Sequence, residues 1–407
     1  MERYESYKDS GIEWIGKIPS HWRIIPLKRI MQIRNGQDYK LYTDNDRYPV
    51  IGSGGCFAYC SRFLYDGEAL LLGRKGTIDK PLYIKGRFWV VDTMFYAVPK
   101  IALNVRYCYY QALTIPFDKY STSTALPSMT QTDLGYHIFC LPPFVEQQAI
   151  VAYLDKRCSE IDKAIATQQK RMALLQELKQ SIITRAVTQG IHPDVPLKDS
   201  GVEWIGKVPE HWEVAFLKRY CSIKTGSTPS TKESKFYDSE DINWFTPGDF
   251  QSDILFDSNK KISDFARACN ACKIFPARSI YMIGIGGTIG KIAVCNEIAS
   301  ANQQINIIIP NRKVYYKYVH YCLTIQKEEI ILSANVVTLP IINQDKTGYL
   351  LLPIPPLNEQ EDIVAYIEYR CKSIDRFISK AKRQIELLQE LKQSVITEAI
   401  TGKIKVC

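Results

Sequence analysis

Two stretches of this chain have almost the same sequence. Residues 8–30 read KDSGIEWIGKIPSHWRIIPLKRI, and residues 198–220 read KDSGVEWIGKVPEHWEVAFLKRY. About two-thirds of the aligned positions are identical. Because chance does not produce a match of this length, we interpret the chain of 407 residues as containing an internal repeat.

A second, longer pair of matching stretches follows in the same order. Residues 142–188 begin PPFVEQQAIVAYLDKRC, and residues 355–401 begin PPLNEQEDIVAYIEYRC, with about half of the positions identical. The offset between the copies grows from 190 residues at the first pair to 213 at the second, so the second copy carries 23 additional residues. This order indicates a tandem duplication.

Each copy of the longer block predicts one long helix. Its apolar residues step by four and three, as in the seam of a coiled coil, and neither run contains Gly or Pro. The predicted seam consists of Leu154, Cys158, Ile161, Ile165, Gln168, Met172 and Leu175 in the first copy and of Ile367, Cys371, Ile374, Ile378, Ala381, Ile385 and Leu388 in the second. Leu178 and Ile182 continue the first seam after a phase slip. We expect the two helices to pack on each other; packing of each on its own globular segment is the alternative.

The segments between the matching blocks, residues 31–140 and 221–353, predict strands and turns. They contain short runs of Tyr, Phe, Ile and Val that are punctuated by Gly, Pro, Asn and Asp. Small islands of similarity survive inside them, one of which is FYAVP, ending at Pro99, against NIIIP, ending at Pro310. We therefore expect the two segments to share one fold and to differ in their surface loops.

A second island is a glycine-rich turn, GRKGTIDK at 73–80 and GIGGTIGK at 284–291. This alignment places Arg74 and Lys75 opposite Ile285 and Gly286. A third island is ALPSMTQTDLGY, which begins at Ala125 and aligns with TLPIINQDKTGY in the second copy.

The fold class that follows is α+β, with two globular α/β domains joined and spaced by two long antiparallel, coiled-coil-like helices and an internal pseudo-twofold repeat. We expect the domain boundaries to be 1–140 for the first globular domain, 141–190 for the first long helix, 191–353 for the second globular domain, and 354–407 for the second long helix and C-terminal tail.

Composition excludes several classes of protein. Hydrophobic residues make up 46% and charged residues 23%, which is typical of a globular protein. No run approaches the roughly 18 apolar residues of a membrane span, and the N-terminal residues lack a signal-peptide core, so we expect no membrane association. The 12 scattered cysteines favour a reducing cytoplasm. The net charge of +9 permits a polyanionic partner without requiring one.

Motifs for catalysis and metal binding are incomplete. The phosphate-loop pattern at Gly11–Lys17 recurs at Gly201–Lys207, but neither copy continues with the Ser or Thr that would hold Mg²⁺. The Pro-Pro motif of amino-group methyltransferases needs a preceding polar residue, whereas this chain has Leu141 and Ile354. A single CxxC motif, starting at Cys269, lacks further ligands at matching spacing. We therefore predict no catalytic residue and no metal site.

The order of short motif, variable segment and long helix, present twice, resembles the specificity subunit of type I restriction–modification systems. The resemblance covers essentially the whole chain and rests on SGIEWIGKIPSHW and SGVEWIGKVPEHW, on PPFVEQQAIVAYLD and PPLNEQEDIVAYIE, and on the shared LLQELKQS tails. The segment TGSTPSTKESKFY at 225–237 also looks like the opening of a target-recognition domain of this family.

The resemblance implies a non-catalytic protein that recognises double-stranded DNA. Each variable segment would be a target-recognition domain for one half of a split DNA sequence. The long helices would space the two halves and dock two methyltransferase subunits, and restriction/translocase subunits would complete the complex. S-adenosylmethionine, ATP and Mg²⁺ would bind to those partner subunits, with no cofactor in this chain. The alternatives are a stand-alone duplicated DNA-binding protein and an enzyme that combines modification with recognition.

Candidate DNA contacts are polar side chains beside glycine-rich turns, because such turns allow the backbone to approach the duplex. The candidates are Arg74, Lys75, Thr77, Thr122 and Ser123 in the first domain and Ser227, Thr228, Thr288, Lys291 and Gln303 in the second. The island residues Thr77, Thr288 and Lys291 recur in both copies, which favours a structural or phosphate-binding role for them. Apolar residues on the outer faces of the long helices are the candidate partner-binding residues: Val151, Leu174, Val364 and Leu387.

Overall fold

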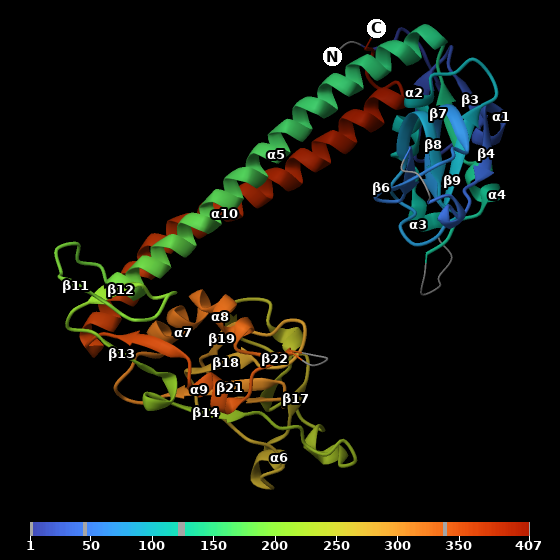
Figure 1. Cartoon of the computed structure of the whole chain (residues 1–407). Coiled ribbons are helices and arrows are strands. Elements are labelled where there is room, and N and C mark those ends of the chain that lie inside the picture. The colour runs from blue at the N-terminus through green and yellow to red at the C-terminus, as the bar shows by residue number, and fades with distance from the viewer. Residues whose placement is uncertain (1–2, 44–46, 121–126, 337–339, 407) are drawn as a thin grey trace. The chain divides into compact units, whose positions relative to one another are not determined.

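The computed structural model describes residues 3–43, 47–120, 127–336 and 340–406. The chain forms two compact units, and the division falls within both long helices rather than at their ends. The first unit consists of Met1–Lys170 with Ala381–Cys407, and the second unit consists of Arg171–Lys380. Each unit therefore contains one globular domain and one half of each long helix (Figure 1).

The first unit is built around a six-stranded sheet in the order β4-β9-β7-β8-β5-β6. Its strands and those of its two small sheets are β1 (Tyr7–Asp9), β2 (Lys17–Pro19), β3 (Arg23–Pro26), β4 (Met31–Asn35), β5 (Tyr48–Gly52), β6 (Gly55–Cys60), β7 (Tyr65–Gly73), β8 (Leu82–Val90), β9 (Met94–Pro99) and β10 (Ile138–Leu141). Its short helices are α1 (Leu27–Ile30), η1 (Lys40–Tyr42), α2 (Val105–Ala112), α3 (Phe117–Tyr120) and α4 (Gln131–Tyr136).

The central strand β7 shows why the sequence forms this sheet. Successive side chains of a strand point to opposite faces, and a strand covered on both faces is a continuous apolar run. Leu70 and Leu72 pack in the cluster that includes the helices, whereas Ala69 and Leu71 pack in a second cluster on the other face. All four residues are fully buried.

The second unit contains a five-stranded sheet in the order β14-β21-β18-β19-β16 and a three-stranded sheet in the order β17-β15-β20. The strands of this unit are β11 (Leu197–Asp199), β12 (Lys207–Pro209), β13 (Glu213–Phe216), β14 (Cys221–Thr225), β15 (Ile242–Phe245), β16 (Ile254–Leu255), β17 (Lys261–Ile262), β18 (Ser279–Ile283), β19 (Ile292–Cys295), β20 (Ser300–Ala301), β21 (Ile305–Pro310), β22 (Asn335–Val336), β23 (Pro340–Ile341) and β24 (Leu351–Ile354). Its short helices are η2 (Leu217–Arg219), η3 (Ser234–Phe236), η4 (Pro247–Asp249), α6 (Asp264–Ala268), α7 (Tyr316–Ile325), α8 (Lys327–Leu332) and α9 (Gln344–Gly348).

The two globular domains share a four-stranded core. The order β4-β9-β7-β8 in the first unit corresponds to β14-β21-β18-β19 in the second. The remainder differs by more than the surface loops that we expected. In the first unit, the segment after β4 adds β5 and β6 to the main sheet. The longer segment after β14 adds β16 to the main sheet and forms β15 and β17, which make the separate three-stranded sheet with β20.

The long helices α5 (Phe144–Gln189) and α10 (Leu357–Ile400) contain 46 and 44 residues. In the first unit, Leu154 near the start of α5 packs in one cluster with Ile396 near the end of α10. In the second unit, Val187 near the end of α5 packs with Ile367 near the start of α10. The two helix halves in each unit therefore run antiparallel.

Most of the predicted seam is buried or half-buried, with one error. Leu154, Cys158, Ile367 and Cys371 are at most 6% exposed. Leu178, which we placed in the seam after a phase slip, is 50% exposed. The neighbouring turn contributes Ile183 to the core instead, at 4% exposure, because the globular domain, and not only the other helix, packs against this part of α5.

The repeated short motif anchors each globular domain to the start of a long helix. In the first unit, the Trp22 indole N–H donates to the Glu146 carboxylate at 2.8 Å, and the His21 ring bonds to the same carboxylate. In the second unit, the Trp212 indole donates to Glu359 at 3.0 Å. The near-identity of the two motifs therefore reflects one packing arrangement that the chain forms twice.

Candidate nucleic-acid interface

The glycine-rich turn of the first domain directly follows β7. Gly76 has a positive φ of 80°, which glycine tolerates without strain, and its N–H donates to the carbonyl of Pro127 at 2.9 Å. Lys75 forms a β-bridge with Ser128 beside this bond. The glycine-rich island and the ALPSMTQTDLGY island are therefore in contact. The predicted residues Thr122 and Ser123 lie outside the described residues.

Among the predicted residues of this turn, Arg74 is held in place and the other two are free to contact a ligand. The Arg74 guanidinium donates to the carbonyl of Asp92 at 3.2 Å and lies 5.8 Å from the Phe95 ring centroid. Lys75 and Thr77 are exposed. The turn thus presents two cations, of which the Arg74 guanidinium is held by the Asp92 carbonyl and the Lys75 ammonium group is exposed.

The second domain forms the same turn with one additional residue. Gly286 has a φ of 105°, and its N–H donates to the Pro340 carbonyl at 3.2 Å, as Gly76 does to Pro127. The strand register supports the same match. Leu70 pairs with Ala97 in the first domain, and Ile280 pairs with Ile308 at the equivalent position of the second. Gly286 is therefore the counterpart of Gly76.

This correspondence corrects the alignment made from the sequence. Arg74 and Lys75 lie opposite Gly284 and Ile285, not opposite Ile285 and Gly286, because the added residue falls within the turn after Gly286. The contrast between the domains is the same in either alignment, since the cationic pair of the first turn corresponds to one glycine and one isoleucine in the second.

Three predicted residues of the second domain gather at the edge of this turn. The Thr228 hydroxyl donates to the Gln303 side-chain carbonyl at 2.5 Å. The Ser227 hydroxyl accepts the Lys273 backbone N–H at 2.8 Å, and the Ser227 carbonyl accepts the Trp244 indole N–H at 3.0 Å. Gln303 adjoins Gln304, whose carbonyl accepts the N–H that opens the glycine-rich turn.

Thr288 and Lys291 lie at the far side of the same turn. Both side chains are exposed, and the Lys291 N–H donates to the Thr288 carbonyl at 3.2 Å. Their backbone therefore closes the turn that leads into β19, while their side chains remain available to a ligand.

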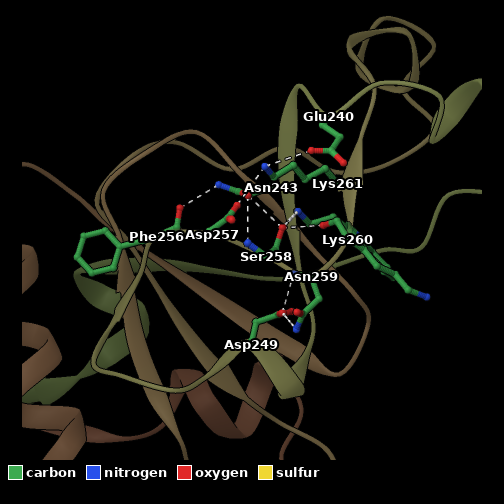
Figure 2. A network of polar contacts seen from close by, with 10 residues as sticks. Glu240, Asn243, Asp249, Phe256, Asp257, Ser258, Asn259, Lys260 and Lys261 are labelled. Atoms are coloured by element: carbon green, nitrogen blue, oxygen red, sulfur yellow. Dashed lines mark hydrogen bonds and ion pairs between the residues drawn. The ribbon is translucent and has the colours of Figure 1, made fainter.

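A polar network in the additional segment of the second domain was not predicted (Figure 2). Asp249 accepts the backbone N–H of Asn259 at 2.9 Å and its side-chain amide at 2.6 Å. The Asn243 amide donates to the Phe256 carbonyl at 3.2 Å. The network thus fixes residues 256–260 while leaving the Phe256 ring 73% exposed.

One sequence signal could have located part of this network. Thr246 and Asp249 form a capping box, in which each side chain bonds to the other residue's backbone. A Thr followed three residues later by an acidic residue is the usual signature of that arrangement. This signature predicts the short helix η4. It does not predict the Asn and Ser partners of the network, which lie at other positions in the sequence.

The first domain presents a surface of exposed aromatic and arginine side chains around β5 and β6. Phe57 and Phe63 are 59% and 40% exposed. The Arg87 guanidinium lies 5.2 Å from the Phe63 ring centroid, and that of Arg62 lies 4.7 Å from the Tyr42 centroid. Aromatic and Arg side chains in this combination are typical of surfaces that contact nucleic acids. Sequence reasoning missed this surface because the participating residues are widely separated in the chain.

A family model described as "Type I restriction modification DNA specificity domain" matches residues 19–172 and again residues 209–387. These matches cover most of the chain and correspond to its two copies. The chain belongs to the type I restriction–modification DNA specificity family. It is a specificity subunit with two target-recognition domains, and it recognises DNA without being the catalytic subunit.

Two relatives from Methanocaldococcus jannaschii are similar over most of their length. The putative type I restriction enzyme MjaX specificity subunit is 26% identical, with 96% of each chain covered. The MjaVIII specificity subunit is 28% identical over 84% of this chain and 78% of its own. A solved chain described under "Structural basis underlying complex assembly and conformational transition of the type I R-M system" has a TM-score of 0.71, 16% identity and coverage of 95% and 99%. The similarity to this solved chain supports the overall fold of the protein.

The specificity subunit exposes two of the four predicted partner-binding residues. Leu174 is 55% exposed and its repeat counterpart Leu387 is 47% exposed. One helical turn later, Leu178 and Leu391 are 50% and 45% exposed. Each long helix therefore carries an exposed leucine pair at the same position of the repeat.

The prediction that Val151 and Val364 lie on outer helix faces is wrong. They are 8% and 2% exposed and belong to the hydrophobic clusters of the first and second units. Each residue precedes the first predicted seam residue of its helix, Leu154 or Ile367, by three positions, so the spacing of four and three continues to it and places it on the packed face. Within the described ranges, no helix of the specificity subunit is both long and apolar enough to cross a membrane.

Proposed function

We propose that each target-recognition domain reads one half of a bipartite sequence in double-stranded DNA. The observation that carries this proposal is the glycine-rich turn, which both domains form with the same Pro contact but with different side chains. Arg74 and Lys75 in the first turn correspond to Gly284 and Ile285 in the second. A shared scaffold with different side chains at the same place accounts for two half-sites that differ.

The long helices set the distance between the half-sites and dock two methyltransferase subunits. The exposed leucine pairs support the docking, because an unpartnered apolar pair that occurs once per repeat suits a partner present in two copies. Restriction/translocase subunits join the same cytoplasmic complex. S-adenosylmethionine, ATP and Mg²⁺ bind to the partner subunits. A stand-alone DNA-binding protein is the alternative, and the family assignment does not favour it.

The experiment is to map methylated sites in DNA from cells that express the complete system. We expect a split motif whose halves have centres about one helical turn apart, on the order of 10 bp. Inserting four residues after Gln168, with a matched insertion in α10, should change the gap and leave both half-sequences intact. An unchanged gap would refute the spacing role, and a continuous motif would refute the bipartite reading.

A further inference from the structure

The strand β6 is an addition to the main sheet of the first domain. In the described part of the chain, β5 pairs in parallel with β8 just as β16 pairs in parallel with β19, so β5 and β16 occupy the same place in the two sheets. The first sheet continues beyond β5 with β6, whereas the second sheet ends at β16. A strand that distinguishes two domains of one fold is suited to reading a difference between their half-sites.

Phe57 is an extra residue within this edge strand. Val50 pairs with Ala58 and Ile51 pairs with Cys56, so Phe57 is the residue by which β6 exceeds β5. Such a β-bulge redirects a side chain, and bulges are frequent at sheet edges and next to functional sites. The redirected ring is 59% exposed.

The Phe57 ring is held in place although it is exposed. It lies edge-to-face against the Tyr39 ring, with the two centroids 5.7 Å apart and the ring planes at 83°. It also covers Gly52, where an added Cβ would lie 3.2 Å from the ring. A ring that is fixed in this way loses little further conformational freedom when it binds a partner.

The loop after β8 connects this ring to the glycine-rich turn. At the start of the loop, the Val91 side chain would lie 3.8 Å from the same added Cβ of Gly52, beside the Phe57 ring. The next residue, Asp92, accepts the Arg74 guanidinium through its carbonyl at 3.2 Å. The Asp92 side chain is exposed and is the one carboxylate of residues 91–93, against two cations in the turn. The ring therefore extends the candidate nucleic-acid interface beyond the turn.

We infer that Phe57 contacts the 5-methyl group of a thymine in one half of the recognised sequence. The inference rests on the proposed function. This methyl group is the apolar feature of an A·T pair in the major groove, and phenylalanine is among the side chains that contact it. An exposed aromatic ring can also unstack two base pairs as a wedge. A wedge has to project from the protein, whereas the Phe57 ring lies over Gly52 and against Tyr39.

The ring and the turn read different chemical features of the bases. The Arg74 guanidinium donates hydrogen bonds, which distinguish guanine by its acceptors. The Phe57 ring donates none, so it distinguishes thymine by the methyl group alone. Uracil keeps every hydrogen-bonding group of thymine and lacks only this methyl group. Replacing thymine by uracil therefore removes the feature that we assign to Phe57 and leaves the features read by hydrogen bonds intact.

The test uses duplexes in which deoxyuridine replaces thymine at one position at a time, across both half-sequences. The specificity subunit is used in its complex with the methyltransferase subunits, as wild type, Phe57→Ala and Phe256→Ala. Phe256 is the matched control, because it is a phenylalanine of the second domain that is 73% exposed. Competition binding gives the ratio of the affinities for the thymine duplex and the uracil duplex.

We expect the wild-type complex to lose about fourfold in affinity at one thymine of one half-sequence, as burial of a single methyl group predicts. Phe57→Ala should bind the thymine and uracil duplexes equally at this position, with the affinity that the wild type has for the uracil duplex. That retained affinity, together with circular dichroism, shows that the variant is folded. Phe256→Ala should keep the fourfold ratio at the same position.

Several results would overturn the inference and leave bipartite recognition intact. They are equal affinities for thymine and uracil at every position in the wild type, or a ratio that persists in Phe57→Ala or disappears in Phe256→Ala. A rise in the fluorescence of 2-aminopurine within the site that requires Phe57 would overturn it in favour of a wedge. A methylation motif that is not split into two halves would refute the proposed function itself.

Discussion

The Lys179 ammonium group donates to the Asp375 carboxylate at 2.7 Å, from one long helix to the other within the second unit. The same ion pair recurs in the first unit between Lys392 and Asp162, also at 2.7 Å. Lys392 is the repeat counterpart of Lys179, and Asp162 is that of Asp375, so α5 and α10 exchange roles. An antiparallel pair of duplicated helices forms the same interhelical contact twice wherever both copies keep the two residues, and this ion pair is such a contact.

Each of these ion pairs should contribute little to stability. The Lys179 and Asp375 side chains are 29% and 53% exposed, and exposed pairs are worth about 0.2–1 kcal/mol. We expect a double-mutant cycle of Lys179→Met with Asp375→Asn to give a coupling free energy of unfolding below about 1 kcal/mol that vanishes near 1 M salt. Denaturant titration at low and high salt measures it. A larger, salt-resistant coupling would contradict this view.

Arg74 should contribute to reading the first half-site, because its guanidinium is held in direction by the Asp92 carbonyl. Arg74→Ala should weaken binding of the complex by roughly 1–3 kcal/mol and relax one position of that half-site. Competition binding with single-base variants of the site measures this. Lys156→Ala, an exposed position on α5, is the control. Uniform weakening with a smaller salt slope would instead assign Arg74 to a phosphate.

The exposed leucine pairs should bind the methyltransferase subunits. Leu174→Glu and Leu387→Glu each place a charge on a side chain that is about half exposed in the isolated chain. We therefore expect the subunit to fold normally while co-purification of the methyltransferase falls at least tenfold, since the charge would be buried unpaired in the complex. Gln169→Glu, at an exposed position of the same helix, is the matched control. Undiminished co-purification of the double variant would exclude these leucines from the interface.

The first unit should lose stability in mild acid because of His137. Burial lowers the pKa of this imidazole from 6.5 to about 4. The folded state disfavours the charged imidazole. The neutral ring therefore leaves the free energy of unfolding at its full value above pH 6.5, and that free energy falls as the pH falls toward 4. The free energy of unfolding should fall by up to about 3 kcal/mol over this range.

His137→Gln should flatten this pH dependence, because the replacement does not titrate and keeps a group that can bond to the Tyr120 hydroxyl, which lies 2.9 Å from Nδ1. His192→Gln, at an exposed position, should leave the slope unchanged. The measurement is denaturant unfolding of the whole chain between pH 7 and pH 4. An identical slope in wild type and His137→Gln would assign the acid sensitivity to other groups.

Some parts of the candidate nucleic-acid interface could be predicted from the sequence, and others could not. The glycine-rich turn could be found because a positive-φ glycine and its Pro partner leave a local signature in both copies. The gathering of Thr228 with Gln303, which are 75 residues apart, and the arginine–aromatic surface around β6 depend on strand pairing that no local pattern encodes. The correction of the alignment by one residue at Arg74 likewise depended on backbone hydrogen bonds, which the sequence does not show.

The duplication, the two long helices and most of their seam follow from the amino-acid sequence alone, because a repeat and a heptad period are local properties of the chain. The packing of each globular domain against the helix end of the other copy could be seen only in the folded structure. Gln111 donates to the carbonyl of Ile400 at 3.1 Å, and the Tyr318 hydroxyl donates to that of Val187 at 3.1 Å. The physical reason is the antiparallel pairing, which brings the end of one helix to the start of the other. The same packing buries Val151 and Val364, which extend the two seams by one step of three residues toward the helix starts.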